Sequence, residues 1–388
     1  MKLLFCTCLE PTKANGATIY TIRVLRALHS LGLDIKVLMI QFYKTDDPPR
    51  GEEWVPGLRE LQHAGVVFRV YPAKSKLSSF VLAYIGLVRE FASSLRNINV
   101  FAFRLVYFQP LCLITKVVRP SVTSIWFHDG IVEEITFVQP DFKHRIMLRL
   151  FEIAEKFGSR FADWEFPVSE KMLDYSRRKG IQGRKGAIVL PCVAETDRFY
   201  LRPAPRCVGN EIIVVGFAGS LAPWQGFEGA CRLLQYLSRH MTLKLHVLTA
   251  EIDKAREIAT HYQLDVFVEW TQHENVPQKM DTWDFALVTQ NAGLITQVCS
   301  PLKAAEALSK GIPLIIAPEI GDFSAIVKRH GIGVVFNPDN PNDWHIVVDN
   351  IREILNNYQA VSQLARNLAE EYYGWRILPQ KIATVLRR

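Results

Sequence analysis

Short apolar runs alternate along the chain with segments in which apolar residues recur every three or four positions. A run of about five apolar residues predicts a buried strand, and recurrence at helical spacing predicts an amphipathic helix. The first repeat of this pattern predicts a strand at residues 3–7, a helix at 17–31 that Gly32 ends, and a strand at 35–40. Strands that alternate with helices in this way are typical of a doubly wound, parallel α/β sheet.

The rest of the first half continues the same alternation. Ser169 stands before a predicted helix at 170–178, where its hydroxyl is expected to cap the first turn. Two further helices are predicted at 80–95 and 143–161. The other predicted strands of this half cover 66–70, 122–127, 166–169 and 188–191.

A change of composition divides the chain. Residues 202–206 read Arg-Pro-Ala-Pro-Arg, inside a stretch at 201–210 that has the composition of a linker. We therefore predict one domain over residues 1–203 and a second doubly wound domain over 204–370. The second domain has a predicted helix at 227–237 and predicted strands at 212–218, 244–248, 266–270, 285–288 and 314–317.

Composition and charge narrow the class of protein. The chain has 388 residues, 49% of them hydrophobic and 22% charged, which is the usual balance of a soluble globular protein with more than one core. The net charge of +7 favours a phosphate-bearing ligand or an anionic membrane over a nucleic acid, because no basic stripe is interleaved with aromatic residues. The seven cysteines are scattered, and Cys6 with Cys8 lacks zinc or thioredoxin-like spacing. These features predict reduced thiols in a cytoplasmic protein without a metal site.

The first third of the chain also bears on membrane contact. Its apolar start reaches Glu10-Pro11 too early for a signal peptide, and the longest apolar run, 80–88, is too short to span a membrane. Residues 74–119 contain seven Lys or Arg and one acidic residue. This segment has two interpretations: a peripheral contact with anionic lipid on the inner face of the membrane, or an internal helix whose charges are solvated.

Two loops follow predicted strands and carry candidate ligand-binding groups. The strand at 122–127 leads into His128-Asp129-Gly130, and polar groups at the carboxyl end of a parallel strand commonly contact ligands. A neutral imidazole there could donate to a sugar hydroxyl, with Asp129 orienting it, although the same turn also occurs as ordinary loop chemistry. Asn15-Gly16 follows the first strand and either lets the backbone approach a ligand or forms a simple tight turn. No G-x-G-x-x-G follows that strand, which argues against a nicotinamide enzyme.

Residues 300–313 are the most informative stretch of the second half. A Ser-Pro turn leads into a short predicted helix that carries Glu306 and ends at Gly311-Ile312-Pro313, before the strand at 314–317. The start of such a helix directs backbone N–H groups toward an anion. The small alanines around Glu306 would let a ribose diol approach its carboxylate, as acidic residues do in dinucleotide folds. The alternative is an amphipathic helix with one solvated Glu.

The order of motifs in the second half resembles a known enzyme family. A strand and Gly-rich loop at 216–226 precede His273-Glu274-Asn275-Val276-Pro277, then Asp284, and finally the Ser-Pro-x-Lys-x-x-Glu and Gly-x-Pro motifs. This series resembles the retaining, nucleotide-sugar-dependent glycosyltransferases of family 4, which have the GT-B fold. The residues that carry the last two motifs are Ser300, Pro301, Lys303, Glu306, Gly311 and Pro313.

The resemblance implies a fold and an activity. The fold would be α/β, with two doubly wound Rossmann-like domains facing across a cleft and residues 371–388 as a C-terminal helix crossing back to the first domain. The activity would be retaining, metal-independent transfer of a sugar from a nucleoside-diphosphate donor, with no other cofactor. The acceptor would be a hydroxyl of a glycan or lipid-linked molecule, in surface polysaccharide or glycoconjugate synthesis.

The resemblance also implies roles for individual residues. It assigns catalytic contacts to His128, Asp129 and Gly16. It assigns donor binding to Asn15, Gly219, Ser220, Gln225, Ser300, Pro301, Leu302, Lys303 and Glu306.

Three positions differ from the family pattern. Val298 stands where a second Glu is frequent, and Ser220 and Gln225 stand where a basic pair often holds the diphosphate. Phosphate binding would then depend on backbone N–H groups at residues 300–303, the Ser220 hydroxyl and the Lys303 ammonium. These differences leave open a catalytically silent GT-B subunit of a glycosyltransferase complex. A sugar-nucleotide epimerase on the same fold is a separate alternative.

Overall fold

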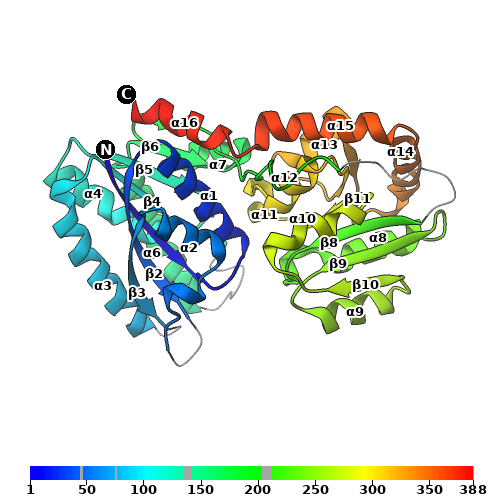
Figure 1. The fold of residues 1–388 in the computed structure, drawn as a ribbon, viewed down its shortest axis with the longest axis horizontal. Helices are drawn as coiled ribbons and strands as arrows, with labels where there is room; N and C mark the ends of the chain where they lie inside the picture. Colours follow the sequence, from blue (N-terminus) through cyan, green and yellow to red (C-terminus); the bar gives the residue numbers. More distant parts are fainter. Residues whose placement is uncertain (44–46, 75–76, 135–141, 203–211, 388) are drawn as a thin grey trace. The chain divides into compact units, whose positions relative to one another are not determined.

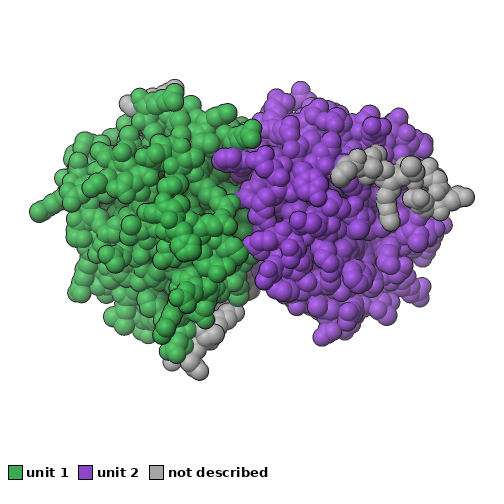
Figure 2. All heavy atoms as spheres, in the orientation of Figure 1, with its two compact units in different colours: residues 1–191, 376–388 green, residues 192–375 purple. Residues whose placement is uncertain are grey.

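The computed structural model describes residues 1–43, 47–74, 77–134, 142–202 and 212–387. The chain forms two compact units, coloured separately in Figure 2: unit 1 comprises residues 1–191 and 376–388, and unit 2 comprises residues 192–375. Residues 192–202, which we expected in the first domain, belong to unit 2, where Arg202 Nη1 donates to the Trp283 carbonyl at 2.6 Å. Most of the linker expected at 201–210 lies outside the described residues.

Unit 1 is built on a seven-stranded parallel sheet (Figure 1). Its order, β3-β2-β1-β4-β5-β6-β7, starts in the middle with β1 and winds outward in both directions, as in a doubly wound fold. The carboxyl ends of β1, β4 and β5 therefore lie side by side at one edge of the sheet. The strands are β1 (Lys2–Leu9), β2 (Asp34–Phe42), β3 (Val67–Ala73), β4 (Val100–Arg104), β5 (Thr123–His128), β6 (Trp164–Pro167) and β7 (Gly186–Ala187).

Helices connect and flank these strands. The last helix of the chain packs with α1, and Lys381 Nζ donates to the Val189 carbonyl at 2.8 Å, so the C-terminal helix belongs to unit 1. The helices are α1 (Gly16–Ser30), α2 (Pro56–His63), α3 (Leu77–Ser94), α4 (Gln109–Val118), α6 (Phe142–Ser159), α7 (Glu170–Lys179) and α16 (Ile377–Leu386). Short 3-10 turns lie at η1 (Gly51–Glu53), η2 (Leu95–Asn97) and η3 (Val106–Phe108).

Most of the elements predicted for the first half are confirmed. Ser169 accepts a hydrogen bond from Met172 N at 2.9 Å and caps α7 as expected. The predicted strand at 188–191 is wrong, because β7 ends at Ala187. Ile188 N still donates to the Glu165 carbonyl at 3.0 Å, but Pro167, which ends β6, has no N–H to return a ladder bond. Strand β4 and helices α2 and α4 were not predicted from the sequence.

The basic segment at 74–119 folds mainly as α3, β4 and α4. Arg104, at the end of β4, is 2% exposed, and Lys116 forms an ion pair with the buried Asp163 carboxylate. At least these two cations face the interior of unit 1. In the part of the chain that the structure describes, no helix combines the length and the apolar character needed to cross a membrane.

Unit 2 contains a six-stranded parallel sheet in the order β10-β9-β8-β11-β12-β13. Gly333, in β13, approaches β12 so closely that a Cβ atom would lie 2.2 Å from the Leu314 carbonyl oxygen. That short, glycine-led strand was missed because its apolar run covers only residues 334–336. The strands are β8 (Ile213–Ala218), β9 (Leu243–Leu248), β10 (Val266–Glu269), β11 (Phe285–Val288), β12 (Leu314–Ile316) and β13 (Gly333–Val335).

The helices of unit 2 pack on this sheet, and the predicted helix at 227–237 is confirmed with the same bounds. The helices are α8 (Phe227–Leu237), α9 (Ile252–His261), α10 (Val276–Lys279), α11 (Leu294–Val298), α12 (Leu302–Ser309), α13 (Phe323–His330), α14 (Trp344–Asn356) and α15 (Tyr358–Leu368). Shorter turns are η4 (Pro223–Gln225), η5 (His273–Asn275), η6 (Met280–Thr282), η7 (Pro341–Asp343) and the π-helical η8 (Ala369–Tyr373).

Candidate functional site

Lys303 lies beside two other predicted donor-binding residues of unit 2, Gln225 and Gly219. Its ammonium donates to Gln225 Oε1 at 2.8 Å and lies 4.5 Å from the centroid of the Phe217 ring. Gly219 follows β8 with a φ of +137°, and a Cβ atom there would lie 3.8 Å from Lys303 Nζ. The loop after β8, turn η4 and helix α12 therefore meet at one point near the carboxyl end of β8.

The electrostatics of Lys303 suit an anion. Burial lowers the pKa of its ammonium to about 8. Its two neighbours, the Gln225 amide oxygen and the Phe217 ring, are uncharged. In the described part of the chain, no carboxylate forms an ion pair with Lys303, so its positive charge can act on a bound phosphate.

The turn before α12 has the geometry that its sequence predicts. Pro301 is extended, with φ −68° and ψ 120°, and α12 begins at the next residue, Leu302. The N–H groups of a first helical turn have no partner within the helix, except that Ala304 N here donates to the Pro301 carbonyl at 3.1 Å. The Ser300 hydroxyl accepts a hydrogen bond from Cys192 N at 3.1 Å, so it anchors this turn to residue 192 of the same unit.

Glu306 lies inside α12 and is 6% exposed. Its Oε1 atom is 3.1 Å from Nε2 of His273, which belongs to turn η5 after β10. The alternative of a solvated Glu on an amphipathic helix is therefore wrong. His273 belongs to a motif of the sequence but had no predicted role, and the structure identifies it as a partner of the Glu306 carboxylate.

Glu306 and Lys303 line the same small cavity. Its volume is about 10 Å³, room for roughly one water molecule, and the remaining lining residues include Ala218, Met280 and Trp283. Gly216 allows this packing, since a Cβ atom there would lie 1.8 Å from Cδ2 of Trp283. Trp283 thus packs against β8 at Gly216 and lines the cavity with the two charged side chains.

The three positions that differ from the family pattern all lie in unit 2. Val298 ends α11 and is 3% exposed, so it is a core residue. Cys299, the next residue, donates its thiol to Gln290 Oε1 at 3.2 Å. Ser220 lies on the exposed loop beside Gly219. Of the residues at the three divergent positions, Gln225 accepts a hydrogen bond from Lys303.

In unit 1, Arg104 joins the other group of predicted residues. Its guanidinium contacts both carboxylate oxygens of Asp129, with Nε 3.1 Å from Oδ1. It also donates to the Ala17 carbonyl at 3.1 Å and to the Thr21 hydroxyl, both on α1. Arg104 thereby fixes the start of α1, which begins at Gly16, relative to the end of β5.

Asn15 has a structural role in this arrangement. It is the N-cap of α1, and its Oδ1 atom accepts a hydrogen bond from Thr18 N at 2.9 Å. This bond satisfies one of the N–H groups that a helix start leaves open.

His128 ends β5 and is held by a different carboxylate from the one we expected. Its Nδ1 atom is 2.8 Å from Glu165 Oε1, which also accepts from the Ser176 hydroxyl at 2.5 Å. The imidazole stacks on the Trp126 ring with centroids 3.9 Å apart. The expectation that Asp129 orients His128 is wrong, because Asp129 pairs with Arg104 and Glu165 contacts the ring.

The same contacts change the hydrogen-bonding role of His128. A neutral imidazole that donates Nδ1–H to Glu165 presents Nε2 as an acceptor, not as the donor that we expected. The side chain is 1% exposed, and its Nε2 atom has no hydrogen-bond partner among the described residues.

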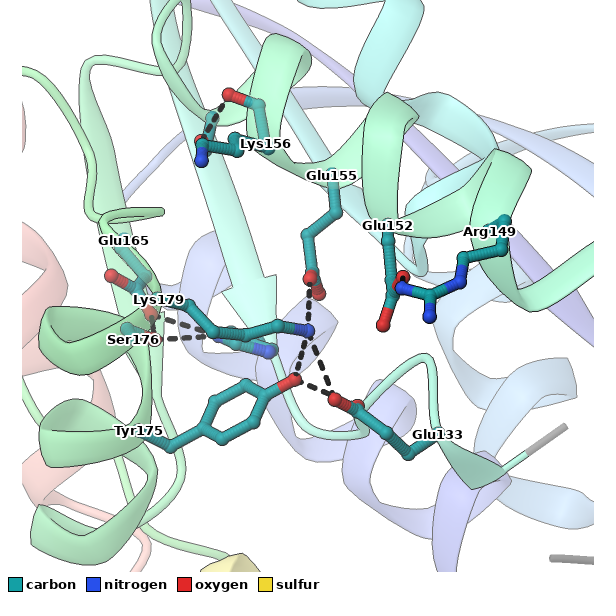
Figure 3. Close-up of polar contacts among 11 residues, drawn as sticks. Glu133, Arg149, Glu152, Glu155, Lys156, Glu165, Tyr175, Ser176 and Lys179 are labelled. Atoms are coloured by element: carbon teal, nitrogen blue, oxygen red, sulfur yellow. Dashed lines mark hydrogen bonds and ion pairs between the residues drawn. The ribbon is translucent and has the colours of Figure 1, made fainter. Parts of the chain in front are cut away.

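A network next to Glu165 stiffens this end of unit 1 (Figure 3). Lys179 Nζ donates to Glu133 and Glu155, each at 3.0 Å, and to the Tyr175 hydroxyl at 2.6 Å. The Tyr175 hydroxyl donates in turn to Glu133 at 2.7 Å. Burial, followed by the nearby Glu155 carboxylate, raises the pKa of Tyr175, so this hydroxyl remains a donor.

No metal centre is evident in the described ranges, where no group of three or more His, Cys, Asp or Glu side chains is arranged to hold an ion.

No protein-family model matches the chain, and no curated protein matches it in sequence. Its fold is similar to those of solved structures over the full chain. One is sucrose-phosphate synthase from Thermosynechococcus elongatus, with TM-score 0.69, 14% identity, and coverage of 100% of this chain and 98% of that chain. A second is Anabaena Alr3699/HepE in complex with UDP, with TM-score 0.71, 16% identity and 100% coverage of both chains.

A third similar structure is WaaG, a glycosyltransferase involved in lipopolysaccharide biosynthesis. Its TM-score is 0.66 at 16% identity, and the match covers 99% of each chain. The two parallel sheets and the full-length matches confirm the expected fold class, GT-B.

Proposed function

We propose that this protein is a retaining glycosyltransferase that moves a sugar from a nucleoside-diphosphate donor to a hydroxyl of a glycan or lipid-linked acceptor. The carrying observation is the convergence of Lys303, Gln225, Gly219 and Glu306 on one end of the unit 2 sheet. The similarity in fold to structures solved with UDP or UDP-glucose supports a donor of this class.

In this proposal, unit 2 binds the nucleoside diphosphate. The Lys303 ammonium and the first-turn N–H groups of Leu302 and Lys303 bind the diphosphate. Glu306, oriented by His273, accepts hydrogen bonds from the ribose hydroxyls. Transfer requires stabilisation of the departing diphosphate, and these cationic and N–H groups would supply it without a metal ion.

The residues of unit 1 contact the transferred sugar in this proposal. His128 Nε2 is buried and has no partner among the described residues, and in a neutral imidazole that donates Nδ1–H to Glu165 it would accept from a hydroxyl of the ligand. Asp129 and the Gly16 turn are held in place by Arg104. The acceptor then attacks the face of the sugar from which the diphosphate departs, as in the family that the sequence resembles.

Thermal shift and donor hydrolysis across a panel of nucleoside diphosphates and nucleotide sugars test the proposal. We expect one nucleotide to raise the midpoint of unfolding, since a ligand that binds only the folded state stabilises it. We also expect the matching nucleotide sugar to be hydrolysed or transferred. No stabilisation by any nucleoside diphosphate at millimolar concentration would overturn the donor assignment.

A silent binding subunit is the second candidate, favoured by the buried Val298 at a position where the family often has Glu. For a silent subunit we expect nucleotide-induced stabilisation without donor turnover, or no stabilisation and no turnover. Donor turnover by the purified chain excludes it.

A further inference from the structure

One face of helix α6 exposes an unusual combination of side chains. Ile146, Leu150, Ile153 and Phe157 are 47%, 60%, 66% and 49% exposed. Their spacing of four, three and four residues places them in one line along the helix. Large apolar side chains that form a continuous exposed stripe mark an interaction surface.

A second line of exposed residues on α6 is cationic. Arg145, Arg149 and Lys156 lie on the helix, and Arg160 follows directly after it. Positions 145, 149, 156 and 160 repeat the helical spacing, displaced by about one residue from the apolar line. These four cations and the four apolar residues together are called the α6 face.

The acidic residues of α6 pair with one of the four cations of this face. Glu155 is 1% exposed in its side chain and points inward to Lys179, as Figure 3 shows. Glu152 pairs with Arg149 at 3.0 Å and is 27% exposed in its side chain. Arg145, Lys156 and Arg160 have no ion-pair partner among the described residues.

Other residues of α6 pack against the rest of unit 1. Phe151 packs edge-on against the Tyr107 ring, with centroids 5.1 Å apart. Gly158 lies so close to α4 that a Cβ atom there would be 2.5 Å from Cβ of Gln109. These contacts are made by other residues than the apolar ones of the α6 face, whose exposure therefore needs another explanation.

We propose that the α6 face binds the surface of an anionic lipid bilayer. An apolar stripe beside a line of Lys and Arg is the pattern of a helix that lies in the membrane interface, with its apolar residues among the upper acyl chains and its cations at lipid phosphates. A two-fold contact between copies of this chain would instead bring cationic faces together. The net charge of +7 makes such a contact still less favourable and a negative surface more so.

The α6 face is not the surface that the charge of residues 74–119 suggested as a membrane contact. Within that segment Arg104 and Lys116 are held by Asp129 and Asp163. The inference does not depend on the proposed function, because lipid binding is measured without nucleotide or acceptor.

Co-sedimentation of the full chain with vesicles tests the proposal. We expect binding to vesicles of phosphatidylglycerol and phosphatidylcholine, and not to vesicles of phosphatidylcholine alone. Binding should weaken as ionic strength rises from about 0.1 M to about 1 M, where the screening length falls from about 10 Å to about 3 Å.

Two double variants separate the apolar and cationic contributions. Arg145→Gln/Lys156→Gln should weaken the vesicle partition about fivefold for each cation removed. Ile153→Gln/Phe157→Gln should weaken it at least tenfold. Ile346→Gln is a matched control, since Ile346 is 48% exposed but lies on α14 of unit 2, and it should bind as the original chain does.

Circular dichroism checks that each variant is folded. The proposal is overturned if the chain ignores anionic vesicles, if it binds neutral ones equally well, or if both double variants bind as tightly as the Ile346→Gln control. It is also overturned if the chain is a dimer in solution that Ile153→Gln/Phe157→Gln converts to a monomer, because the α6 face is then a protein interface.

Discussion

Nε2 of His273 lies 3.1 Å from Oε1 of Glu306, which joins the turn after β10 to helix α12. The two residues are 33 positions apart in sequence. The contact fixes one carboxylate oxygen in a nearly buried position, 6% exposed, beside the cavity that Lys303 also lines. A carboxylate whose orientation is set before binding loses less freedom when it accepts hydrogen bonds from a ligand.

Glu306→Ala should weaken donor binding severely. Loss of charge-assisted hydrogen bonds to the ribose is expected to raise the dissociation constant for the stabilising nucleoside diphosphate roughly 100-fold, about 2.7 kcal/mol. Isothermal titration calorimetry measures it directly. Glu257→Ala, at an exposed position on α9, is the control and should leave affinity unchanged. Unchanged affinity in Glu306→Ala would rule out the ribose assignment.

His273 is expected to act as a positioning residue for Glu306. His273→Ala should raise the KM for the donor about tenfold and leave kcat nearly unchanged, because the carboxylate loses one hydrogen bond. His273→Gln keeps an N–H donor on a side chain of similar reach, so its KM for the donor should lie close to that of the original chain. The double variant with Glu306→Ala should bind no more weakly than Glu306→Ala alone, whereas additive losses would show that the two residues act independently.

Lys303 should make nucleotide affinity dependent on pH. Burial lowers the pKa of Lys303 to about 8 in the protein without nucleotide, and a bound diphosphate would raise this pKa. The affinity for the nucleotide should therefore be highest below about pH 8. Above that pH it should fall, by at most about tenfold per pH unit. The measurement runs from about pH 7, where the diphosphate is already ionised, to about pH 9.5.

The matched variant for this test is Lys303→Arg. A guanidinium stays charged throughout this range, so the fall in affinity above about pH 8 should disappear. If the original chain and Lys303→Arg show the same pH profile, the ammonium does not contact the diphosphate.

The grouping of Lys303 with Glu306 on one short helix was predictable because its signals are local. Pro301, Lys303 and Glu306 fall within six residues, and a turn followed by a helix fixes their relation before any tertiary contact forms. Gln225 was named for its position, but its contact with Lys303 spans 78 residues and depends on the order of β8 and β11 in the sheet. Sequence periodicity predicts that such strands exist and does not predict which side chains meet at their ends.

The partners of the unit 1 residues were missed for the same reason. Arg104 meets Asp129 because β4 and β5 are neighbours in register, with Arg104 opposite Phe127. Glu165 meets His128 because β5 pairs with β6. The apolar run at 100–103 is a usable signal for β4, although it is only four residues long. A buried Arg after such a run indicates an acid on an adjacent strand.

Replacement of Arg104 tests whether unit 1 depends on this junction. Arg104→Met leaves the Asp129 carboxylate, the Ala17 carbonyl and the Thr21 hydroxyl without their shared donor. Removing one partner of a buried ion pair typically destabilises a protein by about 3–5 kcal/mol. We expect faster amide hydrogen exchange in α1 and at the end of β5, measured by mass spectrometry, with α8 and α14 of unit 2 unaffected.

Two further variants separate this local effect from a general loss of charge. Arg89→Met, at an exposed position on α3, should leave exchange in α1 unchanged. Arg104→Met/Asp129→Asn should recover part of the loss, because the uncompensated carboxylate is replaced by a neutral amide. If Arg104→Met exchanges at the original rate in α1, the start of that helix is held by the Asn15 cap and its apolar face alone, and Arg104 does not position the Gly16 turn.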